Sequence, residues 1–126
     1  MSEVKRTERG WPGHFISADK CLFRRNTLLE NATCKVIVST VGNYRVNNHI
    51  EPIGYNNHPR YYETLVFEAV LIGAYYDIAT DKPISFYSPW AICAESVDKL
   101  PNDVDNQADI MHETVVEELI LKLKSS

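Results

Sequence analysis

The sequence predicts an α+β fold, in which an antiparallel β-sheet of about five or six strands is followed by one C-terminal amphipathic helix packed on it. Three observations support this class. Segments rich in β-branched and aromatic residues recur before residue 92, turn residues separate them, and the hydrophobic period changes to that of a helix after residue 101. A length of 126 residues fits a single domain over residues 1–126.

The strand signals begin early in the chain. The clearest strand is Cys34–Val41, because β-branched residues dominate it and suit a pleated, half-buried surface. Leu22–Leu29 is a second candidate, separated from the first by turn residues 30–32, and His14–Ser17 is a short apolar start. The breaker pair Gly42-Asn43 predicts that the clearest strand ends there.

The later strands follow a segment rich in Asn, Pro and His. Val46–Arg60 has the composition of a long loop, and long loops in small domains are more often functional or mobile than structural. Tyr61–Val70 resumes the strand pattern, and a glycine turn leads into Ala74–Ala79, which predicts a hairpin. Ile84–Ile92 is the last predicted strand, and Pro89 within it indicates an edge position or a bulge.

The end of the chain has the pattern of a helix over residues 102–124. Apolar residues recur three or four positions apart, and acidic residues precede basic ones along the segment. The apolar stripe consists of Val104, Ala108, Met111, Val115, Leu119 and Leu123. Ile110, Val116 and Ile120 broaden this stripe and favour a second apolar surface that a partner buries. At the other end, the charged residues 1–12 are predicted to be flexible.

The composition of the chain indicates its cellular compartment. No stretch approaches the roughly 20 apolar residues of a membrane-spanning helix, and Met1–Gly10 is charged without an apolar core behind it. We therefore expect a cytoplasmic protein with no membrane partner. Cys21, Cys34 and Cys93 are odd in number and lie in apolar or strand-like surroundings, which predicts buried, reduced thiols.

Charge is distributed unevenly along the chain. Residues 1–60 hold nine Lys and Arg against five Asp and Glu, whereas residues 61–126 hold four against twelve. The net charge of −4 argues against duplex nucleic acid as a partner, because duplex binding usually needs a broad basic face. A local anion pocket in the first half stays open, and the acidic half either mimics a nucleic acid or only confers solubility.

Known catalytic signatures are missing from the sequence. It has no phosphate-cradling Walker loop, no GxSxG elbow, no HExxH and no metal-ligand spacing. His112 and the carboxylates Asp105, Asp109 or Glu113 could assist proton transfer, but a solvent-facing helix surface is the simpler interpretation of these residues. We therefore expect no enzyme activity, no metal and no cofactor.

Two adjacent arginines carry the main anion-binding signal. Arg24 and Arg25 lie in a predicted strand, so alternation sends them to opposite faces, and one could line a cleft while the other is solvated. Tyr61 belongs to an adjacent aromatic pair, of which one ring points outward and could stack on a base. Asn106 lies in the first helical turn, where free N–H groups favour an anion. The same residues also have a purely structural interpretation, in which the arginines are solvated at the surface and the aromatic rings pack in the core.

Several short strings resemble those of a family of small phage-encoded proteins, the Thoeris anti-defence sponges, over about residues 20–123. These strings are Phe23–Leu28, Val38–Gly42, Arg60–Thr64 and Asp105–Glu113. Members of the family bind a cyclic ADP-ribose isomer made by the host's defence and hold it without degrading it, and some bind cyclic oligonucleotides at a separate site. The resemblance implies a β-sheet followed by helical structure, assembled as dimers or higher oligomers.

The resemblance also implies site residues. Phe86 and Asn106 resemble the family's ring-stacking aromatic and its polar ligand contact, while Arg24, Arg25 and Tyr61 are expected to bind the ligand on chemical grounds. The expected function is capture of a cyclic nucleotide immune signal in the host cytoplasm, without cleavage. The alternative is a protein-binding, anti-CRISPR-like inhibitor of a host nuclease complex, whose acidic surface occupies a basic channel.

Overall fold

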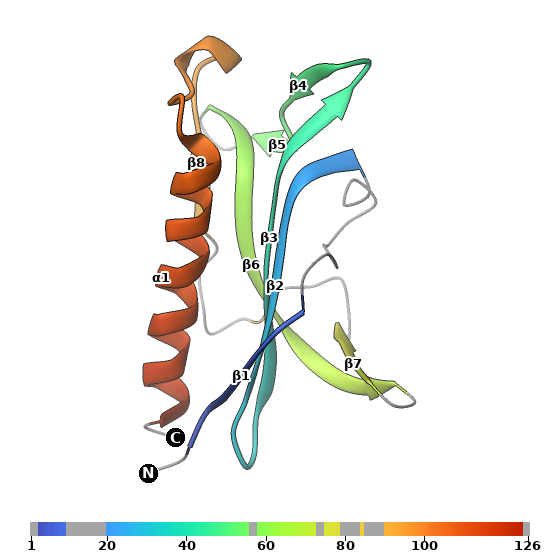
Figure 1. Ribbon diagram of the computed structural model, residues 1–126, viewed down its shortest axis with the longest axis vertical. Coiled ribbons are helices and arrows are strands. Elements are labelled where there is room, and N and C mark those ends of the chain that lie inside the picture. Colours follow the sequence, from blue (N-terminus) through green and yellow to red (C-terminus); the bar gives the residue numbers. More distant parts are fainter. Residues whose placement is uncertain are drawn as a thin grey trace.

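The computed structural model describes residues 3–9, 20–55, 58–72, 75–78, 84 and 90–124. Within these ranges, eight strands precede a short 3₁₀ helix and one long α-helix (Figure 1). The strands are β1 (Lys5–Glu8), β2 (Cys21–Glu30), β3 (Lys35–Val46), β4 (His49–Glu51), β5 (Gly54–Tyr55), β6 (Pro59–Ile72), β7 (Tyr75–Ile78) and β8 (Trp90–Cys93). The helices are η2 (Val97–Lys99) and α1 (Val104–Lys124). The predicted α+β class is confirmed, with more strands than the sequence indicates.

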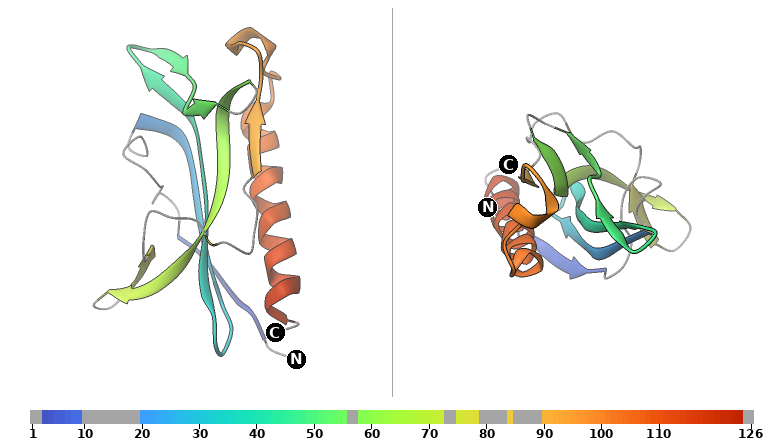
Figure 2. Two further views of the ribbon diagram at one scale, coloured as in Figure 1. Left: turned by 180° about the vertical axis from the view of Figure 1, so that it is seen from behind. Right: turned by 90° about the horizontal axis from the view of Figure 1, so that it is seen from above.

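The described strands all pair in antiparallel fashion. The sheet order is β1-β2-β3-β6-β5, while β4 pairs with β3, and β7 and β8 both pair with β6. The long strands β2, β3 and β6 form the centre of the sheet and twist along their length (Figure 2). At its far end β6 curls away from the helix, and β7 joins it there (Figure 1). The pairing of β6 with β7 confirms the predicted hairpin.

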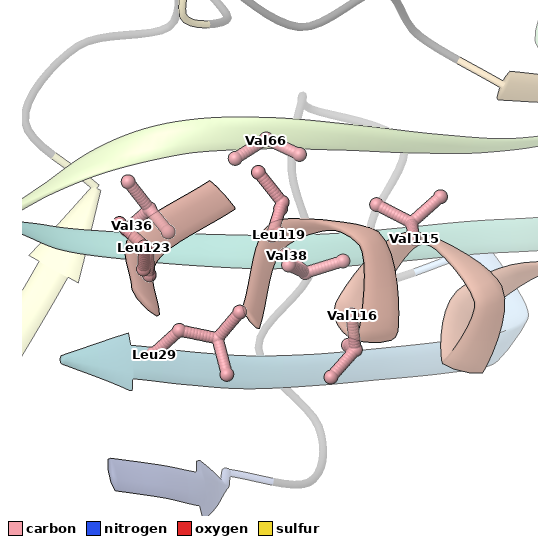
Figure 3. Packing of buried hydrophobic residues seen from close by; sticks show 8 residues of the cluster. All are labelled: Leu29, Val36, Val38, Val66, Val115, Val116, Leu119 and Leu123. Atoms are coloured by element: carbon pink, nitrogen blue, oxygen red, sulfur yellow. The ribbon is translucent and has the colours of Figure 1, made fainter. Parts of the chain in front are cut away.

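One face of the sheet is covered by α1, which lies along the central strands (Figures 1 and 2). The buried side chains of this interface are shown in Figure 3. They are Leu29, Val36, Val38 and Val66 from the sheet and Val115, Val116, Leu119 and Leu123 from the helix. Full burial of one such side chain contributes about 1.5–3 kcal/mol, so the interface fixes the helix on the sheet. The predicted stripe is confirmed, and Val116 packs on the protein's own sheet instead of a partner.

A second cluster lies near the start of α1. Tyr62 packs against Ala108 and Met111, and Phe23 meets the Tyr62 ring edge-on with the ring centroids 5.8 Å apart. Gly42 lies opposite Tyr62 in β3, where a Cβ atom would come within 2.0 Å of Tyr62 Cδ2. The glycine therefore permits a close approach inside the strand. The prediction that it ends the strand is wrong, since β3 continues past it.

Much of the segment predicted as a long loop, residues 46–60, belongs to the sheet. Asn47 and Asn48 join β3 to β4 with φ angles of 51° and 67°, the left-handed values that a two-residue hairpin turn requires. Strand β5 then pairs with the start of β6. Asparagine adopts these φ values more readily than most residues, so part of the asparagine content of this segment reflects turn geometry.

Strand β1 lies within residues 1–12, which the sequence predicts to be flexible. It pairs with β2 from Lys5 opposite Glu30 to Glu8 opposite Thr27. A short, polar edge strand has no hydrophobic period, and its composition therefore does not reveal it. The predicted strand His14–Ser17 and most of the predicted strand 84–92 lie outside the described residues.

The three cysteines form no disulfide and lie in different surroundings. Cys21 is buried, Cys34 is half-buried and Cys93 is exposed, so the prediction of a buried thiol is wrong for Cys93. Within the described ranges, no helix combines the length and the apolar character that crossing a bilayer requires.

Candidate functional site

The face of the sheet opposite α1 has two halves of different chemistry. Near β7, Leu28, Ile37 and Ala69 form a small apolar cluster against which Ile78 packs. Further along the same strands, polar side chains point to this face, because successive side chains of a strand point to opposite faces of the sheet. We call this half the polar face, and it consists of Arg9, Arg24, Asn26, Ser39, Arg60 and Glu63.

Asn26 and Ser39 lie at the centre of the polar face. They are cross-strand neighbours on β2 and β3, and neither has any exposed surface. Val41 and Leu65, which surround them on β3 and β6, are buried as well. Burying an amide or a hydroxyl costs free energy unless the group is hydrogen-bonded. Two such residues in the middle of a sheet therefore need hydrogen-bond partners.

Arg9 fixes the orientation of the Asn26 amide. The backbone N–H of Arg9 donates to the backbone carbonyl of Asn26 at 2.7 Å. The Arg9 side chain donates from Nη1 to the side-chain oxygen Oδ1 of Asn26 at 3.2 Å. Because Oδ1 accepts from Arg9, the Nδ2 group is left to find another acceptor, and none lies within hydrogen-bond distance among the described residues. A buried donor without an acceptor costs about 1–3 kcal/mol, so Asn26 is an unsatisfied polar group in the middle of the sheet.

Arginines give the polar face its charge. Arg24 is half-buried on β2 opposite Val41 of β3, and the other neighbour of Val41 is Glu63 of β6. Arg60 Nε lies 2.8 Å from Glu63 Oε1, and this carboxylate is almost fully buried. With Arg9, three guanidinium groups share the described polar face with one carboxylate, in a protein whose total charge is −4. The local charge therefore favours an anion.

Five residues are predicted to bind the ligand, and the structure describes four of them. These four do not lie together. Arg24 and Arg25 point to opposite faces of β2, as strand alternation predicts. Tyr61 is 3% exposed within the second cluster, and burial raises the pKa of its phenol. Asn106 is exposed on the first turn of α1. Phe86 lies outside the described residues.

Arg25 joins β1 to α1 on the helix side of the sheet. Its guanidinium lies 2.9 Å from Glu8, 3.1 Å from Glu113 and 3.3 Å from Asp109. Desolvation disfavours the charge of Arg25, but its carboxylate partners outweigh this effect and raise the pKa of Arg25. A phosphate would have to displace these carboxylates to bind Arg25.

His112 is fully buried between helix and sheet, so its interpretation as part of a solvent-facing helix surface is wrong. Its Nε2 lies 2.7 Å from Thr27 Oγ1, and its Nδ1 lies 2.7 Å from Thr40 Oγ1. Thr40 Oγ1 lies 2.6 Å from Thr64 Oγ1, while Thr27 Oγ1 donates to Glu8 at 2.9 Å. These groups form one continuous chain of hydrogen bonds from β6 to β1.

Glu8 determines the direction of this chain. A carboxylate only accepts hydrogen bonds, so Thr27 donates its hydroxyl proton to Glu8 and accepts from His112 Nε2–H. His112 Nδ1 then accepts from Thr40, which accepts from Thr64 in turn. The geometry fixes the neutral Nε2–H tautomer of His112, and burial lowers the pKa of His112 to about 4.

These contacts make His112 a structural residue, because both ring nitrogens are occupied and the ring cannot reach solvent. The carboxylates suggested to act with it also have partners: the Tyr62 hydroxyl donates to Asp105. The helical period could have placed His112 in the core, since it follows Ala108 by four residues on the stripe. The threonine hydroxyls come from three strands, which spacing along the sequence does not reveal.

Comparisons with known proteins give no identification. No protein-family model matches the sequence, and searches of curated proteins and of solved structures give no significant match. In the part of the chain that the structure describes, no three His, Cys, Asp or Glu side chains gather as a metal site would require. The resemblance to the anti-defence sponges stays a prediction, and the candidate site is defined by the geometry of the polar face.

Proposed function

We propose that this chain is a phage-type anti-defence protein that binds a cyclic nucleotide immune signal on the polar face and holds it without cleaving it. The ligands expected from the resemblance are a cyclic ADP-ribose isomer or a cyclic oligonucleotide. The observation that supports this proposal is the buried Asn26 amide, flanked by Arg9 and Arg24, on a sheet face whose described side chains carry a net positive charge. The oligomeric state implied by the resemblance stays a prediction.

The groups of the polar face match the chemistry of a nucleotide. Arg9 and Arg24 suit a phosphate, because the planar guanidinium donates two parallel hydrogen bonds to it. Asn26 Nδ2 suits a carbonyl oxygen or a ring nitrogen of a base. A ligand that carries both phosphate and base would engage all of these groups at once.

Capture without turnover is consistent with the positions of the acid–base candidates. His112 lies on the helix side of the sheet, with both ring nitrogens bound to threonines. Asp109 and Glu113 lie on the same side, in ion pairs with Arg25. The sheet separates all of them from the polar face, so they cannot contact a ligand there.

A retention assay tests the proposal. Purified protein is mixed with a panel of cyclic ADP-ribose isomers and cyclic oligonucleotides, filtered and heat-denatured, and mass spectrometry identifies what is released. We expect one class of ligand to be retained and to emerge intact only after denaturation. Altered ligand in the filtrate would identify an enzyme, and a panel without any retained ligand would contradict the proposal.

A matched pair of variants locates the site. Arg24→Gln removes a guanidinium from the polar face, and we expect the Kd for the retained ligand to rise about tenfold or more, as loss of a charge-assisted hydrogen bond predicts. Arg6→Gln removes a guanidinium from the helix side, where Arg6 pairs with Glu113, and should leave the Kd unchanged. Equal effects of the two variants would contradict the placement of the ligand.

A further inference from the structure

The outer side of α1 carries a groove that lies on the opposite side of the sheet from the polar face. Its volume is about 650 Å³. We call it the helix groove, and the lining residues that matter here are Asp109, Ile110, Glu113, Glu117, Glu118 and Leu121. The groove combines apolar side chains with carboxylates, so its chemistry differs from that of either sheet face.

Ile110 and Leu121 give the helix groove its apolar surface. They are 58% and 68% exposed, although isoleucine and leucine are among the residues most often buried. Eleven positions apart at about 100° per residue, they point within about 20° of each other and lie about 16 Å apart along the helix axis. Two apolar side chains at this spacing fit a partner helix of about three to four turns.

The charge of the helix groove selects the kind of partner. Of its four carboxylates, Asp109 and Glu113 pair with Arg25, and Glu113 also pairs with Arg6 of β1, so two guanidinium groups face four carboxylates. Glu117 makes no ion pair within the described residues, and the groove is left with an excess of negative charge. A second copy that met this surface symmetrically would bring the same excess against it, which is unfavourable. Lysine and arginine side chains on a partner would instead be attracted.

We infer that the helix groove docks a basic amphipathic helix of another protein. Apolar side chains of that helix would cover Ile110 and Leu121, and its flanking cations would meet Glu117 and Glu118. This inference goes beyond nucleotide capture, and neither depends on the other because the two surfaces lie on opposite sides of the sheet. It gives the acidic second half of the chain a binding role.

A designed peptide probes the groove directly. The probe is a fluorescein-labelled helix of about 15 residues, with Leu at positions i, i+4, i+7 and i+11 and Lys on both flanks. Fluorescence anisotropy of the full chain with this peptide should give a Kd in the micromolar range that rises with salt concentration. The same peptide with Glu in place of Lys should bind at least about tenfold more weakly.

Surface variants make the test specific. The double variants Ile110→Ser/Leu121→Ser and Glu117→Lys/Glu118→Lys should each raise the Kd of the Lys peptide at least about tenfold. Leu22→Ser is the matched control, since Leu22 is 61% exposed on β2, and it should leave the Kd unchanged.

Three results would overturn the inference. The first is failure of the Lys peptide to bind, and the second is binding that the groove variants do not weaken. The third is a concentration-dependent dimer in sedimentation velocity that Leu121→Ser abolishes, because this result would assign the groove to a second copy.

Discussion

A histidine with both ring nitrogens hydrogen-bonded in a site without solvent is held neutral, and this links the stability of the protein to pH. His112 takes a proton less readily in the folded chain than in the unfolded chain, because burial lowers its pKa from 6.5 to about 4. Protonation would also require Thr40 to accept from Nδ1, which reverses the hydrogen bonds on that side of the ring.

The sign of the resulting pH dependence follows from these two pKa values. Between pH 6.5 and 4 the unfolded chain binds a proton at His112 that the folded chain does not, so the free energy of unfolding falls as the pH falls. We expect a loss of up to about 3 kcal/mol across this window. Urea titrations over the same pH range measure it. His112→Gln, which keeps one donor and one acceptor, should flatten the slope.

Two features distinguish the contribution of His112 to this pH dependence from the contributions of other titrating groups. The pKa values of Glu8 and Glu113 are lowered, so these groups lose their contribution only below the ordinary carboxylate pKa of 4.5. For Glu8 burial opposes the shift, and hydrogen bonds from Arg25 and Thr27 outweigh it. His49→Gln, on the exposed strand β4, should keep the wild-type slope. A His112→Gln variant with an unchanged slope would contradict the assignment.

A second prediction at the scale of one residue concerns the close packing of Gly42. Gly42→Ala places a methyl group against the buried ring of Tyr62, and we expect a loss of about 1–3 kcal/mol in the free energy of unfolding. Gly54→Ala is the matched control, because the Cβ there would meet the flexible end of the Arg60 side chain. Thermal melts should show a clearly larger fall in Tm for Gly42→Ala, and equal falls would contradict the packing described.

At the scale of elements, β1 is held mainly by charge. Its side chains Arg6 and Glu8 pair with Glu113 of α1 and Arg25 of β2, while few apolar groups anchor it. Ion pairs of this exposure contribute little individually, but a network that shares one arginine costs less side-chain entropy for each pair. The strand is therefore the part of the described sheet that we expect to open first.

Arg25→Gln tests this interpretation of β1. The change removes the guanidinium that Glu8, Asp109 and Glu113 share, and we expect a loss of about 1 kcal/mol in the free energy of unfolding. Amide hydrogen exchange should become faster in β1 while the amides of β3 remain protected. Faster exchange throughout the sheet would show that Arg25 supports the whole core instead of one edge.

Some elements could be predicted from the sequence because their signal is local. Apolar spacing in 102–124 and β-branched residues in 34–41 report directly on one buried face, and the structure contains the corresponding α1 and β3. Strand β1 has no such signal, since its polar side chains are positioned by ion pairs with residues distant in sequence. Gly42 shows the opposite case, in which a typical breaker lies inside a strand because an aromatic ring needs the space.

At the scale of the whole molecule, the candidate site depends on what the sheet brings together. Alternation predicts that Arg24 and Arg25 point to opposite faces, but only the packing of α1 shows that Arg25 faces the helix. The roles of Asn26 and Ser39 depend on cross-strand pairing and on burial, which a single sequence does not display. The helix period could have placed His112 in the core, whereas its bonds to Thr27 and Thr40 required the fold.

The most direct test of the central claim is an NMR titration of ¹⁵N-labelled protein with the retained cyclic nucleotide, in which the side-chain Nδ2 resonances of Asn26 are observed. Ligand binding on the polar face predicts saturable shifts of these resonances and of the backbone amides of Arg24 and Ser39, with the outer residues of α1 unaffected. Saturable shifts confined to α1, or no shift of the Asn26 amide at saturation, would contradict it.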